Sequence, residues 1–378
     1  FTVTPWDVEG HVDYKRLIEK FGTQRIDEKL KKRIFSNAGD ENLYMKRDFV
    51  FSHRDMDKVM DDVEDGEDFF LYTGMGPSGP MHIGHIIAFK MTQWFQEKFD
   101  VNVYIQFPDD EKYWSRDVDY GDIERFGRDN LRDVAAVGFD PDKTFIFKNT
   151  EYIGNMYKSA TKVASKINNS VASSVFGFES STNIGLNFYP ALQILPTFFE
   201  DKRCLIPAGI DQDPYWRIQR DIAQKFGHKK ASQIHNKLLP ALKGPDGKMS
   251  SSKPSSAIML DDDPEEAREK VMKKAYSGGQ VTKEEQREKG ADLSVDVAYQ
   301  WLYNLFIEDD DRIEEIGRKY EKGEMLTGEV KEILAEELGS FLRQHQKRKE
   351  KADSLVQDMM YEGKLAKEMW DKQIEIEK

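Results

Sequence analysis

The feature that most constrains the fold is an alternation, between residues 68 and 260, of short apolar runs with segments of helical length. The runs are rich in aromatic and β-branched residues and are bounded by Gly, Pro or Asp: "DFFLYTG" (68–74), "VNVYIQF" (101–107), "KTFIFKN" (143–149) and "RCLIPAG" (203–209). Strands that alternate with helices predict an α/β fold with a mostly parallel sheet and helices on both faces. Ligands of such sheets bind beyond the carboxyl ends of the strands. Residues that follow these runs are therefore the first candidates for a site.

The pattern of the chain predicts three parts. Residues 1–60 form a mixed N-terminal extension with charged helical stretches, and residues 61–260 form the α/β body. Residues 261–378 carry no further strand pattern and predict an all-helical C-terminal domain. In that domain, apolar residues recur at three- and four-residue spacing between Val330 and Leu342, which indicates one buried helix face. The segment 261–264 ("DDDP") is the expected hinge.

Composition limits the environment and the partners. The chain has 378 residues, one cysteine and no stretch near the ~20 apolar residues of a membrane span. It begins with no pattern typical of a secretory signal. We therefore expect a cytoplasmic protein without disulfides or membrane contact, in which Cys204 is part of the core. The net charge of −13 argues against a general nucleic-acid wrapper, but basic patches such as "RQHQKRKEK" (343–351) leave RNA binding open.

The stretch "TGMGPSGPMHIGHIIAF" (73–89) joins the first apolar run to a helix predicted to begin near Met81. Glycines let a backbone approach an anion closely, and the free N–H groups of a helix start point at it. His82 and His85 are three residues apart, so both imidazoles lie on one face of the first turn. Gly84 leaves room for a flat base. The alternative is a tight strand-to-helix turn with two ordinary histidines.

Two signatures make the chain resemble a known family. "PMHIGH" resembles the HIGH signature of class I aminoacyl-tRNA synthetases, and "GKMSSSKP" (247–254) resembles their KMSKS signature. The further stretches "DDEKY", "IDQDPYWR", "AYSGG" and "EMLTGEVK" resemble the tryptophanyl-tRNA synthetases of archaeal and eukaryotic type, from roughly Phe70 to Lys331. The resemblance implies a Rossmann-like catalytic domain and a helical anticodon-binding domain. It also implies a homodimer whose substrates are L-tryptophan, ATP with Mg²⁺, and tRNA(Trp).

The reaction implied is activation of the tryptophan carboxylate by ATP, release of pyrophosphate, and transfer to the 3′ end of the tRNA. Because a carboxylate is already ionised above about pH 4, this activation needs alignment and positive charge instead of a general base. The resemblance implies that His82 and His85 contact the phosphates and that Lys248 lies on a closing loop. Ser251 replaces the second lysine of the signature, so its charge has to come from Lys248, Lys253 or a residue elsewhere, and Lys112, which follows a strand end, is the candidate for a share of it. We expect no metal-ligand set from the protein.

The nucleotide site follows from the same resemblance. Asp211, directly after the strand "RCLIPAG", is suited to accept hydrogen bonds from ribose hydroxyls. Asp213 stands before Pro214 at a helix start, which predicts a helix cap. The residues implied to contact ATP are Gly74, Gly84, Gly209, Asp211, Met249, Ser250 and Ser252.

The amino-acid pocket has to complement an indole N–H, which only donates and therefore needs an acceptor. Strand alternation places Gln106 on the face opposite its apolar neighbours, at the strand's end. The resemblance implies that Tyr72 and Gln106 meet the indole nitrogen. It further implies that Glu111, Gln193 and Gln212 bind the ammonium and carboxylate of tryptophan. For Gln193 the alternative is a polar position on a helix surface.

The sequence also suggests tRNA-binding residues and leaves alternative functions open. The basic run suggests Arg343, Lys347 and Arg348 as tRNA-binding residues. The nearest alternative function is a tyrosyl-tRNA synthetase, which shares fold and signatures but is disfavoured by "DQDPYWR". A small-molecule adenylyltransferase and a non-catalytic, synthetase-like RNA-binding or regulatory protein are further alternatives. The replaced lysine favours the last of these, and the intact histidines oppose it.

Overall fold

A seven-stranded sheet forms the centre of the computed structural model, which describes residues 2–3, 8–9, 13–249 and 254–377. The strand order is β3-β4-β9-β8-β5-β6-β7, and the five strands from β9 to β7 are parallel, whereas β3 and β4 run antiparallel at one edge. The bounds are β3 (Gln24–Arg25), β4 (Val50–Arg54), β5 (Phe69–Gly74), β6 (Val103–Phe107), β7 (Thr144–Lys148), β8 (Arg203–Gly209) and β9 (Ser232–Asn236). The predicted α/β class and all four predicted strands are confirmed.

Two short hairpins lie outside this sheet. They are formed by β1 (Thr2–Val3) with β2 (Val8–Glu9), and by β10 (Pro240–Ala241) with β11 (Gly244–Lys248). The second hairpin leads directly into the lysine- and serine-rich signature, of which residues 250–253 lie outside the described part of the chain.

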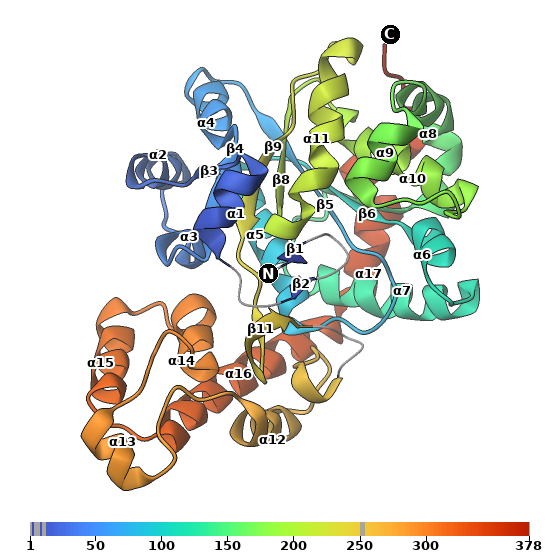
Figure 1. Ribbon diagram of the computed structural model, residues 1–378. Helices are drawn as coiled ribbons and strands as arrows, with labels where there is room; N and C mark the ends of the chain where they lie inside the picture. Colours follow the sequence, from blue (N-terminus) through green and yellow to red (C-terminus); the bar gives the residue numbers. More distant parts are fainter. Residues whose placement is uncertain (1, 4–7, 10–12, 250–253, 378) are drawn as a thin grey trace.

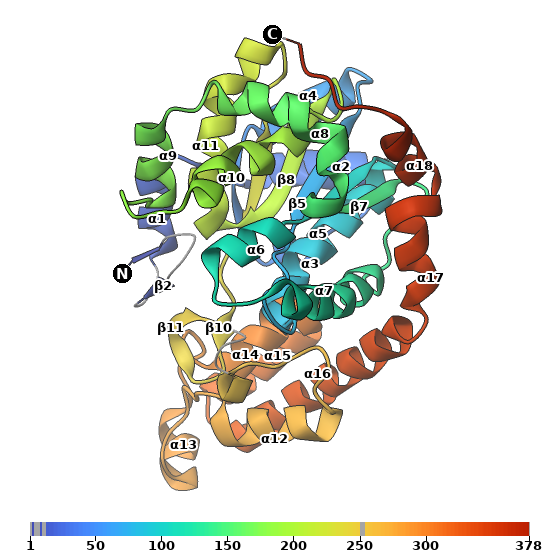
Figure 2. The same ribbon diagram turned by 90° about the vertical axis from the view of Figure 1, so that its right-hand side faces the viewer.

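Helices cover both faces of the sheet (Figures 1 and 2). Alternate residues of β5 explain how two cores arise, because neighbouring side chains of a strand point to opposite faces. Phe69 and Leu71 pack into a core with α5, whereas Phe70 and Tyr72 pack into a second core with α8, α10 and α11. The bounds in this part of the chain are α1 (Tyr14–Phe21), α2 (Glu28–Ala38), α3 (Leu43–Lys46), α4 (Met56–Glu64), α5 (Ile83–Phe99), α6 (Asp109–Ser115), α7 (Tyr120–Ala135), α8 (Asn149–Ala164), α9 (Asn169–Phe176), α10 (Ile184–Ile194) and α11 (Asp213–Ile222).

From residue 264 onward the described chain is helical, as predicted. Figure 1 shows α12 to α16 below the sheet. The apolar face predicted for α16 is confirmed, because Val330, Leu334, Leu338 and Leu342 are buried and join the same core as α5. The bounds are α12 (Pro264–Lys274), α13 (Lys283–Lys289), α14 (Val297–Trp301), α15 (Asp310–Glu321), α16 (Thr327–Lys349), α17 (Ala352–Gln357) and α18 (Lys364–Asp371).

Segments from the first sixty residues and from the C-terminal part of the chain both pack against the α/β body. The strands β3 and β4, from the first sixty residues, extend the central sheet. At the other end, α18 contacts β7, and Leu365 and Met369 pack into the second core (Figure 2). The three-part division of the chain remains a prediction.

Two further expectations concern burial. Cys204 lies fully inside β8, and burial raises the pKa of its thiol well above the usual range, as expected for a core cysteine. Among the described residues, no helix combines the length and apolar character needed to cross a membrane.

Candidate active site

The glycine-rich turn after β5 ends in a pair of stacked imidazoles. His82 is the N-cap of α5, and its Nδ1 accepts a hydrogen bond from the backbone N–H of Gly84 at 3.1 Å. His85 Nδ1 accepts from the backbone N–H of His82 at 3.1 Å. The two rings stack with centroids 3.6 Å apart. Because a nitrogen that accepts carries no proton, each neutral ring holds its proton on Nε2.

The segment that follows the second signature is joined to this turn by backbone hydrogen bonds. The N–H of Ile83 donates to the carbonyl of Ile258 at 3.0 Å, and the N–H of Leu260 donates to the carbonyl of Met81 at 2.9 Å. Met249 lines a cavity of about 290 Å³ together with both histidines. Residues far apart in sequence, from both predicted signatures, therefore meet at one cavity.

Other predicted nucleotide residues line this cavity as well. Gly74, Gly84, Gly209 and Asp211 are all in its wall. A Cβ atom at Gly209 would lie 2.5 Å from Asp211 Oδ1, so a side chain there would displace the carboxylate. The predictions on Ser250, Ser251, Ser252 and Lys253, and on the side chain of Lys248, fall outside the described part of the structure.

A second cavity of about 440 Å³ adjoins the first and shares part of its wall, including His85, Gly209 and Gln212. It lies beyond the carboxyl ends of β5, β6 and β8, where a parallel sheet binds its ligands. The predicted tryptophan-binding residues are brought together here with Lys112: the lining includes Tyr72, Gln106, Glu111, Lys112, Gln193 and Gln212.

Several buried polar atoms of this second cavity have no hydrogen-bond partner within the described residues. They are Gln193 Oε1, Glu111 Oε1 and Trp216 Nε1. Leaving a polar atom buried and unpaired costs free energy, so these two acceptors and one donor call for a ligand. Gln193 is 8% exposed, which excludes the alternative of a helix-surface position. The indole N–H of Trp216 is a site feature that the sequence reasoning missed, because tryptophan in an amphipathic helix resembles core.

The charges in this cavity suit a zwitterion. Glu111 Oε2 lies 2.8 Å from Lys112 Nζ, so a carboxylate and an ammonium stand side by side in the wall. The Glu111 side chain is 4% exposed and the Lys112 side chain 16%. At the far end, the Tyr72 hydroxyl donates to Gln106 Oε1 at 2.6 Å. Burial raises the pKa of Tyr72 well above its usual range, so this hydroxyl stays protonated.

The prediction that Asp213 caps a helix is wrong. Asp213 is the first residue of α11, and its buried carboxylate accepts from Arg54 Nε at 2.5 Å and from Arg54 Nη2 at 2.9 Å. Burial is the largest single influence on this carboxyl and raises its pKa, but the hydrogen bond from Arg54 together with the nearby charges of His235, Arg54 and Arg217 outweighs burial, and the pKa is lowered. This ion pair ties β4 to the residue that follows the cavity-lining turn 209–212.

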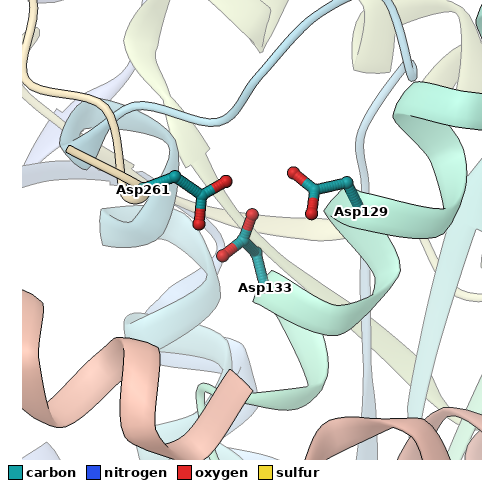
Figure 3. Close-up of side chains that lie close together, drawn as sticks. All are labelled: Asp129, Asp133 and Asp261. Carbon is teal, nitrogen blue, oxygen red and sulfur yellow. The ribbon is translucent and has the colours of Figure 1, made fainter. Parts of the chain in front are cut away.

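One group of three carboxylates among the described residues has the spacing of a metal site: Asp129, Asp133 and Asp261 (Figure 3). Lys349 Nζ already lies 2.9 Å from Asp129, 3.0 Å from Asp133 and 2.8 Å from Asp261. Lys349 is buried at 6% exposure. The group is therefore an ionic junction between α7, the segment before α12, and α16, and it is separate from both cavities.

The predicted tRNA-binding residues lie on the last turns of α16. All three residues are exposed, and Arg348 Nε also donates to the carbonyl of Ala136 at 2.7 Å. None of the three lines either cavity. Their role in tRNA binding stays a prediction.

Comparison with known proteins relates the chain to one family. The model of the family described as class I tRNA synthetases (W and Y) matches residues 64–343. The tryptophan–tRNA ligase of Saccharolobus solfataricus is 56% identical over 373 residues, covering 98% of each chain, and that of Thermococcus onnurineus is 52% identical over 376 residues, covering 99% of this chain and 98% of the relative. The crystal structure of Plasmodium falciparum tryptophanyl-tRNA synthetase superimposes with a TM-score of 0.88 at 39% identity, covering 94% of this chain and 99% of that one.

Proposed function

The chain belongs to the class I tryptophanyl-tRNA synthetases, and from that premise we propose how its two adjoining cavities perform the reaction of a tryptophan–tRNA ligase. The enzyme activates L-tryptophan with ATP to tryptophanyl-adenylate and pyrophosphate and then transfers tryptophan to tRNA(Trp). The main support for the proposal is that the two cavities adjoin and share part of their walls. One has two Nε2–H imidazoles at a helix start, and the other has partnerless polar atoms beside a carboxylate–ammonium pair.

The activation step is an in-line substitution at the α-phosphorus. A carboxylate oxygen of tryptophan forms the new bond to phosphorus, the bond to the bridging oxygen breaks, and pyrophosphate leaves. The nucleophile is already anionic, so no protein base is required. We assign to His82 and His85 the donation of their Nε2–H groups to phosphate oxygens, with the N-terminus of α5 adding its dipole. Lys112 and Lys248 supply the cations that stabilise the leaving pyrophosphate.

The nucleotide would lie in the smaller cavity. Adenine packs on Gly84, where the lack of a side chain keeps the helix surface flat. Asp211 accepts from the ribose hydroxyls beside Gly209. Gly74 gives the triphosphate close access to the backbone, and we also assign contacts with ATP to Met249, Ser250 and Ser252.

Tryptophan would lie in the larger cavity. Glu111 and Gln193 offer acceptors to the ammonium group, and Gln212 lies between the two cavities, where the carboxylate has to meet the phosphate. The indole nitrogen reaches Tyr72 and Gln106. Support comes from the partnerless Gln193 Oε1 and Glu111 Oε1, which an ammonium group would satisfy.

Mg²⁺ enters the proposal as the counter-ion of the ATP phosphates. The one carboxylate cluster of suitable spacing in the described chain is held by Lys349, away from the nucleotide cavity. The residues present therefore fit an ion that arrives bound to phosphate, which would neutralise charge on the leaving pyrophosphate.

The remaining partners are proposed on the family alone. Residues 261–378 would bind the anticodon region of tRNA(Trp), with contacts from Arg343, Lys347 and Arg348. A homodimer acting in the cytoplasm is the expected form.

Exchange of labelled pyrophosphate into ATP tests the proposed function. We expect exchange that depends on tryptophan and not on tyrosine, followed by charging of tRNA(Trp). Exchange with tyrosine alone would reassign the substrate. Folded protein that exchanges with neither amino acid would refute the enzymatic function.

A further inference from the structure

We propose that Asn149, the buried first residue of α8, determines which hydrogen-bonding groups the amino-acid cavity presents to the ring of its substrate. The inference rests on the proposed function in one respect, that the ligand of this cavity is tryptophan. Asn149 is fully buried and lines neither cavity, so it acts as a positioning residue through Gln106.

The direction of a hydrogen-bond chain is set at one end by a backbone amide. The N–H of Glu111 donates to Asp110 Oδ1 at 2.7 Å, and Asn149 Nδ2 donates to the same oxygen at 2.9 Å. A backbone N–H can only donate, so Asp110 Oδ1 accepts from it, and this oxygen also accepts from Asn149 when the carboxyl is ionised or carries its proton on Oδ2. The NH₂ group of Asn149 therefore faces Asp110, and Asn149 Oδ1 points the other way, toward Gln106.

Backbone carbonyls set the direction at the other end. Gln106 Nε2 donates one hydrogen to Asn149 Oδ1 at 2.8 Å and the other to the carbonyl of Leu192 at 3.0 Å. Both N–H groups of Gln106 are thereby occupied. Its Oε1 is left facing Tyr72, whose hydroxyl donates to it at 2.6 Å.

The result is a cavity wall that offers only lone pairs at this position. Tyr72 and Gln106 line the larger cavity, the single hydroxyl proton of Tyr72 is taken up by Gln106 Oε1 at 2.6 Å and the carbonyl of Gln193 at 3.0 Å, and Gln106 has no N–H to spare. An indole N–H, which only donates, matches this wall. A ring of the same shape with an acceptor in place of the N–H would face lone pair against lone pair.

Reversal of the Gln106 amide is opposed at Asn149 and Leu192, because it would set Oε1 against two acceptors, Asn149 Oδ1 and Leu192 O. The Tyr72 hydroxyl does not oppose it, since that oxygen can accept from an NH₂ group and donate to the carbonyl of Gln193 at 3.0 Å. Gln106 is 1% exposed, so each such mismatch would be buried and costly. Without Asn149, only the Leu192 carbonyl holds the amide.

The test compares tryptophan with β-(1-benzothiophen-3-yl)alanine, in which sulfur replaces the indole N–H. Specificity constants for both are measured by pyrophosphate exchange, and dissociation constants by calorimetry, which does not need the reaction. We expect Asn149→Leu to lower the preference for tryptophan by about tenfold, the loss of one oriented hydrogen bond. For each variant, the specificity constant for tryptophan is divided by that for the analogue, both measured on the same preparation. This preference ratio does not depend on the fraction of the protein that is folded.

Two variants make the test specific to Asn149. We expect Asn149→Asp to keep the wild-type ratio at acidic pH, because one carboxyl oxygen still accepts from Gln106 and a protonated carboxyl donates to Asp110. The control is Asp109→Asn, which removes a neighbouring buried carboxylate that accepts from the N–H of Thr150 at 3.1 Å instead of from Asn149. Its ratio should equal that of the wild type.

An unchanged ratio in Asn149→Leu, by exchange and by calorimetry, overturns the inference. A ratio in Asn149→Asp at acidic pH as low as that of Asn149→Leu overturns it too. These outcomes differ from failure of the proposed function, which is the absence of tryptophan-dependent exchange by folded wild-type protein. In that case the calorimetric ratios still decide the role of Asn149.

Discussion

Replacing Arg54 by methionine should destabilise the protein far more than its position at the end of a polar strand suggests. Arg54 gives two hydrogen bonds to the Asp213 carboxylate, whose side chain is 0% exposed. It also donates to the carbonyl of Gly22 at 3.0 Å and to that of Phe21. Methionine preserves the length of the side chain and removes the charge. Removing one partner of a buried ion pair costs about 3–5 kcal/mol.

The free energy of unfolding that Arg54→Met loses should be larger at neutral pH than at acidic pH. In the wild type the pKa of Asp213 is below its usual value, although burial, the largest single influence, raises it, because Arg54, His235 and Arg217 together outweigh burial and Arg54 contributes both a hydrogen bond and a charge. That stabilisation is present above the unfolded-state pKa of about 3.9 and is lost as the pH falls through the folded value. In Arg54→Met, burial dominates and raises the pKa, so stability falls as the pH rises. The difference between the two proteins therefore grows from acid toward neutral pH.

Urea denaturation at about pH 4 and about pH 7 measures both free energies of unfolding. The matched control is Arg217→Met, which removes a guanidinium 3.2 Å from the same carboxylate. The Arg217 side chain is 42% exposed, so we expect a loss of about 1 kcal/mol or less. Equal losses in the two variants, or a pH-independent loss in Arg54→Met, would refute this reasoning. We also expect Arg54→Met to raise the KM for ATP, because residues 209–212 precede Asp213.

Three further predictions address other groups. His85→Ala should lower the rate of tryptophan activation by about 100- to 1000-fold and leave tRNA affinity unchanged in filter binding; equal losses would make His85 structural. Burial raises the pKa of Asp110 to about 7, so this carboxyl reduces stability as the pH rises from about 4 to 7. Asp110→Asn should therefore melt at a higher temperature than the wild type at pH about 8 but not at pH about 5, and an equal gap at both would contradict this. Lys349→Ala should expose three carboxylates to each other, so millimolar Ca²⁺ should raise the melting temperature of the variant and not of the wild type.

The strands show how far the sequence predicts the fold. β5, β6, β7 and β8 were predictable because their residues are apolar and buried on both faces, as in any parallel sheet. β4 and β9 were not, because "VFSHR" and "SQIHN" are rich in polar residues. Their buried side chains satisfy one another instead, as in the 2.9 Å contact between Ser52 of β4 and His235 of β9. Such pairing between distant segments leaves no periodic signal.

The site residues also divide into those that the local sequence predicts and those that it does not. Residues next to a signature, such as His82 and His85, could be predicted because the chemistry is carried within a few residues of the chain. Asn149 could not, because its two partners lie in other helices and strands and its own neighbours carry no sign of them. Lys349 was part of a basic run, and only the fold reveals that three carboxylates surround it. The role of a polar residue such as Asn149 or Lys349 therefore depends on contacts with residues distant in sequence, which the local sequence does not reveal.

The most direct test of the account is a crystal structure with a non-hydrolysable tryptophanyl-adenylate analogue. We expect adenine against Gly84, the ribose at Asp211, and the indole nitrogen within hydrogen-bond distance of Gln106 Oε1 or the Tyr72 hydroxyl. An analogue bound elsewhere, or bound with its indole in the smaller cavity and its adenine in the larger one, would contradict the assignment of both cavities.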